Sequence, residues 1–117
     1  MDKYMLFFRS SLPNEDAFQS MSPEEMQAEI QKWNTWIGGI AAQGKLVSSE
    51  GLYPSGKVVN GSKHVITDGP FVESKEIVGG YLMMHAASMD EAIEAAKGCP
   101  VFEREGRVEV RQVQNFN

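Results

Sequence analysis

The sequence predicts an α+β domain of the ferredoxin-like kind, with the element order β-α-β-β-β-α-β. Two segments begin with the S-x-x-E capping box that is typical of helix N-termini, and each lies between predicted strands. Short apolar or alternating segments typical of strands fill most of the remaining chain, at residues 4–9, 46–53, 57–68, 79–87 and 106–113. Split β-α-β halves of this kind place both helices on one face of an antiparallel sheet.

The first helix is predicted from several agreeing signals at its start. Ser22 can cap the helix, Glu25 completes the capping box, and Pro23 suits the first helical position. Gly44 is placed to end the helix. The 3.6-residue period predicts one apolar stripe along it, made of Met26, Ile30, Trp33, Ile37 and Ile40.

The second helix is predicted to start at the capping box Ser88-Met89-Asp90-Glu91 and to stop before Gly98 and Pro100. The single cysteine of the chain, Cys99, follows this helix end, so no intrachain disulfide forms. The negative end of the helix dipole disfavours a thiolate there. We therefore expect a structural role for Cys99.

The middle of the chain is predicted to form a hairpin. Residues 46–53 and 57–68 are strand-like, and Pro54-Ser55-Gly56 between them suits a hairpin loop. The second segment is interrupted at Asn60-Gly61, where we expect a further tight turn or a bulge.

Strand parity predicts what covers the second face of the sheet. Leu82, Met84 and Ala86 share one face, and Tyr81, Met83 and His85 share the other. On the last strand, Glu109 and Arg111 fall on the second face as well. The side chains on this second face are too large and too aromatic for a surface exposed to solvent, and too polar for an ordinary hydrophobic core. This pattern predicts a homodimer that stacks two open sheets and leaves a cleft of mixed polarity between them.

Length and composition bound the class of protein. A chain of 117 residues is predicted to be one domain, residues 1–117, and its 42% hydrophobic content argues against disorder. The formal charge of −5 disfavours binding to nucleic acid or to anionic membranes. No export signal or membrane-spanning run is visible, so we expect a soluble cytoplasmic protein.

Cofactor and metal chemistry have no support in the sequence. The chain has no glycine-rich nucleotide motif and no metalloprotease motif. His64 and His85 are the only histidines, and no clustered carboxylates accompany them, so we predict no metal site.

The quartet Asp68-Gly69-Pro70-Phe71 predicts an abrupt end to a strand. An Asp in a turn usually accepts the N–H two residues on, but that residue is Pro70, which has none. The Asp68 carboxylate therefore has fewer local hydrogen-bond donors than an Asp in a turn usually has. Either it accepts the Phe71 N–H and holds the corner, or it has a chemical role.

Several ordered blocks resemble the DGPF branch of the YCII-related family. They are D-G-P-F, then E-x-K-E and Gly79-Gly80-Tyr81, with Gly51-Leu52-Tyr53-Pro54 before them and Met89-Asp90-Glu91-Ala92, Gly98-Cys99-Pro100 and Glu109-Val110-Arg111 after. The resemblance covers nearly the whole chain. It implies a dimeric α+β barrel in a small bacterial protein, largely uncharacterised. Some such proteins are encoded beside, or fused to, sigma factors.

One feature of the family is missing. Its core branch has a histidine on the first helix, paired with an Asp, whereas Trp33-Asn34 stand at about that place here. Acid–base chemistry would then fall to Asp68 or His85, whose imidazole titrates near neutral pH. His85 also suits a purely structural, hydrogen-bonded role.

Four residues are candidates for ligand binding. Arg111 can clamp an anionic group or simply pair with Glu109 or Glu50. Glu50 and Tyr81 are placed with it, and Lys75 is included on the family pattern alone.

Two classes of function are consistent with these residues. The first is a cofactor-independent enzyme that binds a small anionic or aromatic molecule in the cleft between the dimer sheets. The alternative is a non-catalytic module that binds a ligand or a protein partner and is associated with sigma-factor regulation.

Overall fold

The computed structural model describes residues 1–11, 21–69 and 76–116. Its elements in chain order are β1 (Asp2–Ser11), α2 (Pro23–Ala42), β2 (Leu46–Gly51), β3 (Gly56–Asn60), β4 (Val65–Gly69), β5 (Glu76–Ala86), α3 (Met89–Ala96), the 3-10 helix η1 (Pro100–Arg104) and β6 (Arg107–Gln112).

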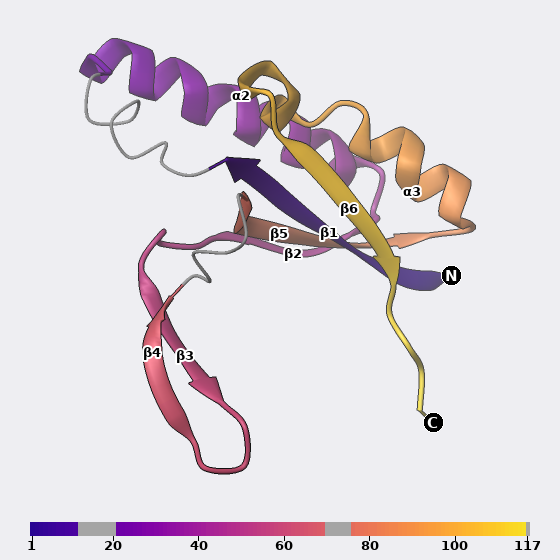
Figure 1. Cartoon of the computed structure of the whole chain (residues 1–117). Helices are drawn as coiled ribbons and strands as arrows, with labels where there is room; N and C mark the ends of the chain where they lie inside the picture. The colour runs from indigo at the N-terminus through magenta and orange to yellow at the C-terminus, as the bar shows by residue number, and fades with distance from the viewer. Residues whose placement is uncertain (12–20, 70–75, 117) are drawn as a thin grey trace.

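Four of the strands form one antiparallel sheet in the order β2-β5-β1-β6. Both α-helices cover the same face of this sheet (Figure 1). The predicted α+β class and ferredoxin-like arrangement are confirmed, because the two central strands are the first and the third of the four in chain order.

Both helices start where the capping boxes predict. The Ser22 Oγ accepts a hydrogen bond from the Glu25 N–H at 3.1 Å, and the Ser88 Oγ accepts one from the Glu91 N–H at 3.2 Å. Each bond satisfies a backbone donor that has no partner within the helix. The sequence therefore fixes the helix starts locally, before tertiary packing contributes.

Helix α2 is rotated slightly from the predicted orientation. Ile30, predicted in the apolar stripe, has 52% of its surface exposed, whereas Glu29 is buried at 9%. The Arg104 Nε lies 3.2 Å from the Glu29 Oε1, so an ion pair joins the carboxylate to η1. The prediction for Ile30 is wrong because this distant partner cannot be seen in the helix's own period.

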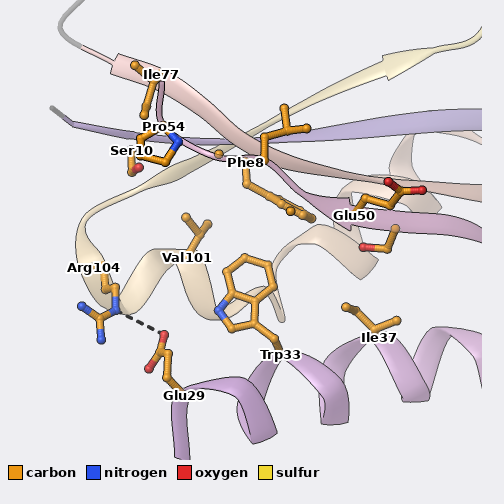
Figure 2. A pocket seen from close by; sticks show the side chains of 14 residues that line it. Phe8, Ser10, Glu29, Trp33, Ile37, Glu50, Pro54, Ile77, Val101 and Arg104 are labelled. Carbon is orange, nitrogen blue, oxygen red and sulfur yellow. Dashed lines mark hydrogen bonds and ion pairs between the residues drawn. The ribbon is translucent and has the colours of Figure 1, made fainter. Parts of the chain in front are cut away.

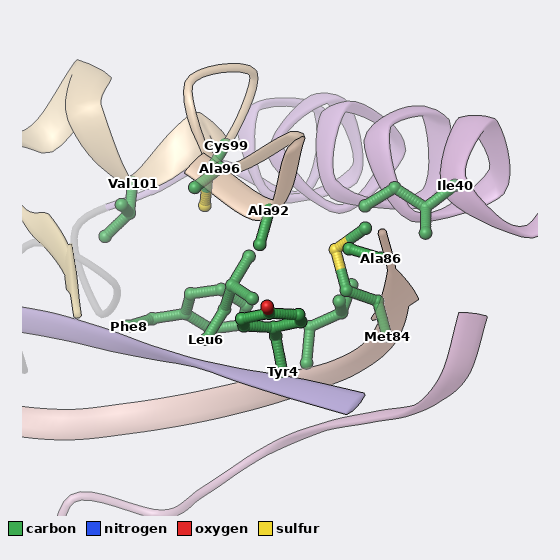
Figure 3. Close-up of a cluster of buried hydrophobic side chains, with 11 residues drawn as sticks. Tyr4, Leu6, Phe8, Ile40, Met84, Ala86, Ala92, Ala96, Cys99 and Val101 are labelled. Atoms are coloured by element: carbon green, nitrogen blue, oxygen red, sulfur yellow. The ribbon is translucent and has the colours of Figure 1, made fainter. Parts of the chain in front are cut away.

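The hydrophobic core lies between the helices and one face of the sheet (Figure 3). Leu6, Leu82 and Met84 are its largest fully buried side chains. Around them lie the buried side chains of Tyr4, Phe8, Ile40, Ala86, Ala92, Ala96, Cys99 and Val101. The predicted assignment of Leu82, Met84 and Ala86 to the helix-covered face is confirmed.

Gly80 allows β2 and β5 to approach closely. A Cβ built on Gly80 would lie 2.7 Å from the Glu50 backbone oxygen and 3.2 Å from the Gly51 Cα. Real Cβ atoms do not come so near to backbone, so a side chain at this position would push the two strands apart.

The predicted hairpin around Pro54-Ser55-Gly56 is wrong. Strand β2 pairs with β5, and the Leu52 N–H continues that contact by donating to the Gly79 oxygen at 2.9 Å. Strand β3 pairs instead with β4, in a separate two-stranded sheet. Residues 52–55 therefore connect two sheets.

The turn expected at Asn60-Gly61 is the true hairpin turn. Gly61 and His64 both have positive φ angles, 66° and 57°, which reverse the chain between β3 and β4. The Asn60 Nδ2 donates to the Val65 oxygen at 3.0 Å and to the Thr67 Oγ1 at 3.1 Å, so one side chain ties the two strands together.

Cys99 is part of the packed core. It is 3% exposed, and burial raises the pKa of its thiol to about 11. The thiol is therefore protonated at neutral pH, in agreement with the structural role expected from the sequence.

The described part of the chain contains no helix that is both long and apolar enough to cross a membrane.

Truncating a fully buried side chain tests the position of the core. We expect Leu82→Ala to lower the free energy of unfolding by about 2–5 kcal/mol, because it removes apolar contacts and leaves a cavity. Leu52→Ala, at a leucine that is 52% exposed, is the matched control and should cost less than about 1 kcal/mol. Urea denaturation at a single protein concentration measures both. Equal losses in the two variants would contradict this location of the core.

Candidate functional site

The sheet face opposite the helices, called the open face below, holds most of the predicted site residues. The register places Glu50, Tyr81, Phe7 and Glu109 opposite one another in one row across the sheet. The next row holds Ser48, Met83, Met5 and Arg111, and His85 follows opposite Lys3. The predicted grouping of Tyr81, Met83, His85, Glu109 and Arg111 on one face is confirmed.

Three charged side chains on the open face, Arg9, Glu109 and Arg111, lie close to one another. The Arg9 Nε lies 2.9 Å from the Glu109 Oε1, and the Arg111 Nε lies 3.9 Å from the Glu109 Oε2. Arg111 thus has the carboxylate contact that the sequence offered as its structural role. Its side chain is nevertheless 70% exposed, so the guanidinium is accessible from solvent.

Asp68 lies apart from these residues within the chain. It is on β4, in the separate hairpin sheet, where it forms an exposed ion pair with Lys57 across the strands. Lys75 and the Pro70-Phe71 half of the quartet lie outside the described residues. One chain therefore brings together Glu50, Tyr81, His85 and Arg111 but does not bring Asp68 to them.

A pocket of about 440 Å³ lies on the other side of the sheet, between β1, β2, β5, helix α2 and η1 (Figure 2). Its volume falls within the range usual for small-molecule sites. Apolar side chains make up most of its wall: Phe8, Trp33, Ile37, Leu52, Pro54, Ile77 and Val101. This feature is called the helix–sheet pocket below. Of the predicted site residues, Glu50 borders it.

An ion pair lies at one end of the helix–sheet pocket. Figure 2 shows the Arg104 guanidinium and the Glu29 carboxylate joined beside Trp33. The Glu29 side chain is 11% exposed and that of Arg104 is 26% exposed. Arg104 also directs its Nη2 to the Met21 sulfur, at 3.6 Å. A fixed cation thus borders an apolar cavity.

Aromatic rings make the inner wall of the pocket rigid. Phe8 contacts Trp33 edge-to-face, with ring centroids 4.9 Å apart, and contacts Trp36 at 5.7 Å. The Trp36 Nε1 donates to the Ala95 oxygen at 2.9 Å, which joins α2 to α3. The ring positions are therefore held from three elements, so the pocket is largely preformed.

Glu91 has a lowered pKa, and it lies away from the pocket. The Lys45 ammonium hydrogen-bonds to its carboxylate, and the Ala87 N–H donates to the same group at 3.3 Å. Both contacts favour the charged form and hold the pKa below its ordinary value of 4.5. This pair fastens the start of α3 to the segment that leads into β2.

No metal centre is formed by the described residues. Within residues 1–11, 21–69 and 76–116, no three His, Cys, Asp or Glu side chains gather in a way that could hold an ion.

Comparison with protein families agrees with the sequence blocks. The family model of the YCII-related domain matches residues 5–117. The chain belongs to the YCII-related family. A search of curated proteins gives no match. Two of the sequence blocks that carry the resemblance border the helix–sheet pocket of this YCII-related domain. Gly51, Leu52 and Pro54 come from one block, and Gly79 comes from the other.

Sequence reasoning missed Glu29 and Arg104. A signal for Glu29 was present, since it lies four residues before Trp33 and is in phase with the apolar side of α2. A charged residue in phase with an apolar stripe indicates a buried partner. Arg104 is distant in sequence, so nothing local identified it as that partner.

The lowered pKa of Glu91 predicts a pH dependence of stability. A carboxyl group whose pKa falls on folding stabilises the native state above its unfolded pKa, and this contribution is lost as the pH falls through the folded value. We expect wild type to lose stability more steeply than Glu91→Gln as the pH is lowered from neutral to below 4.5. Urea midpoints across this range measure the difference. Glu94→Gln, at an exposed carboxylate paired with Lys97, is the control and should follow wild type. Parallel curves for wild type and Glu91→Gln would contradict the assignment.

Proposed function

We propose that this YCII-related domain binds a small aromatic or apolar molecule with an anionic group in the helix–sheet pocket. The observation that carries the proposal is the preformed apolar cavity with the Glu29–Arg104 pair at one end. Pockets of this kind take a ligand body by apolar contact and orient it through a few polar groups.

Arg104 is the group that selects for an anion. Its Nε donates to the Glu29 Oε1 at 3.2 Å, which holds the guanidinium at the end of the pocket. Charge-assisted hydrogen bonds to a guanidinium are among the strongest that a carboxylate accepts, so the proposal places the ligand carboxylate beside Arg104. Glu29 in turn keeps Arg104 directed at the pocket when no ligand is bound.

The proposed site differs in place from the cleft predicted between two stacked sheets. The helix–sheet pocket belongs to a single chain, whereas the cleft needs a second one. Ligand binding in the cleft, and proton transfer by Asp68 or His85, stay predictions. The non-catalytic module remains the alternative function for either site.

A pair of matched ligands tests the pocket. We expect 2-naphthoate to raise the thermal midpoint, since a ligand at a hundred times its Kd adds about 2.7 kcal/mol to stability. Arg104→Met should weaken 2-naphthoate about ten- to a hundredfold, because it removes a charge-assisted hydrogen bond. It should change binding of the neutral 2-naphthamide little, and isothermal titration measures both affinities.

Two further variants locate the ligand. Ile77→Ala should weaken both compounds, because it shortens an apolar side chain in the wall of the pocket. Arg111→Met, on the open face, should alter neither. If Arg111→Met abolishes 2-naphthoate binding while Arg104→Met leaves it intact, the ligand lies in the cleft between sheets and the pocket assignment is wrong.

We also propose that the domain is a homodimer through its open face. The supporting observation is the half-buried apolar group at the centre of that face, Met5, Phe7, Tyr81 and Met83, in two adjacent rows. Apolar groups of this kind at the centre of a surface, rimmed by charges such as Glu109 and Arg111, are typical of protein interfaces.

A charge at the centre of the open face should separate the dimer. We expect light scattering after gel filtration to give twice the 13.0 kDa chain mass for wild type and the chain mass for Met83→Glu. Met89→Glu, at an exposed methionine of α3, is the control and should remain dimeric. A monomeric wild type at micromolar concentration would refute the homodimer.

A further inference from the structure

The β3–β4 hairpin, called the hairpin arm below, extends away from the rest of the described chain. Its strands pair with each other and belong to a separate sheet. Figure 1 shows it on the side of the four-stranded sheet opposite the helices. The radius of gyration is 15.9 Å, whereas a compact chain of this length is expected to have about 13 Å. The arm therefore gives the molecule an extended shape.

The hairpin arm carries uncovered apolar side chains, and two of them, on one side, face each other directly across the strands. Val59 and Ile66 lie directly opposite each other and are 61% and 66% exposed. The Lys57–Asp68 ion pair lies on the same side, nearer the base of the arm. The other side holds Thr67, bonded to the Asn60 amide, and also Val65, which is 55% exposed. A two-stranded hairpin by itself is marginally stable in water, so the apolar side needs a surface to pack on.

We propose that the hairpin arm is a dimerisation arm, which packs its Val59–Ile66 side on the open face of a second copy of the chain. This inference rests on the homodimer proposed above and names the segment of the partner that covers the open face. In a twofold dimer each chain gives one arm and receives one. The arm leaves the sheet on the side of the open face.

The dimensions of the two surfaces agree. Five-residue strands such as β3 and β4 are about 16 Å long, and a four-stranded sheet is about 14 Å wide between its outer strands. An arm laid across the partner sheet thus spans its full width. The central rows of that sheet present Phe7 and Met83 to the arm, flanked by the charges of Glu109 and Arg111.

Both surfaces carry charges of both signs. The arm presents Lys57 and Asp68 beside its apolar pair, and the open face presents both an accessible guanidinium and a carboxylate. When each chain places its hairpin arm on the other chain, Asp68 of the partner subunit comes to the face that holds Tyr81, His85 and Arg111. The candidate residues that one chain keeps apart are then collected in a site that only the dimer completes.

Crosslinking between distinguishable chains tests the arm. One chain carries Ile66→Cys on the apolar side of the arm, and a second, tagged chain carries Met83→Cys on the open face. After mixing and subunit exchange, a short bis-maleimide should join tagged to untagged chains. Thr67→Cys, on the other side of the arm, is the matched control and should crosslink severalfold less. Wild type, whose one thiol is buried, should not crosslink.

Combined with the mass measurements, the outcomes separate the arm from the dimer itself. The expected result is the Ile66→Cys to Met83→Cys crosslink, together with a raised dimer Kd for the double variant Val59→Asp, Ile66→Asp. A dimer that Met83→Glu separates, but that shows no such crosslink and no effect of the arm variants, would overturn the arm and leave the homodimer standing. A monomeric wild type would overturn both.

Discussion

The edge-to-face packing of Phe8 against Trp33 and Trp36 is the contact on which the rest of the structure depends. It joins the central strand β1 to helix α2, and the Trp36 indole N–H carries the connection on to α3. Two indole rings between a helix and a sheet occupy more depth than aliphatic side chains would. Towards the start of α2 the described side chains fill the space between the layers only partly, and the helix–sheet pocket lies there. The same contact therefore stabilises the fold and bounds the cavity.

The two faces of the sheet divide the chemistry of the domain. The helix-covered face offers a preformed apolar cavity with one ion pair, whereas the open face offers aromatic and charged side chains in rows. Glu50, on the edge strand β2, borders the cavity and also stands opposite Tyr81 of the open face. Membership of the YCII-related family fixes the domain type and leaves the reaction open, because a shared fold does not transfer chemistry.

Features determined by local sequence were predictable here. The capping serines Ser22 and Ser88 started both helices where expected, and the period-2 pattern of β5 placed Leu82 and His85 on the correct faces. Features determined by distant partners were not. Nothing near Glu29 reveals Arg104, and the choice of β5 over β3 as partner for β2 depends on the whole sheet. The helix–sheet pocket escaped prediction for the same reason, since its walls come from five elements.

The central position of β1 in the sheet determines the order in which the chain can fold during synthesis. Its neighbours are β5 and β6, which begin at Glu76 and Arg107, and the Arg9–Glu109 pair closes across 100 positions of sequence. A nascent chain on the ribosome thus carries β1 with no strand partner until two thirds of the sequence has emerged. Meanwhile the β3–β4 hairpin closes locally, within about 1–10 μs. An apolar strand that waits this long is exposed to other unfolded chains. The last strand, β6, ends that exposure by covering the remaining edge of β1.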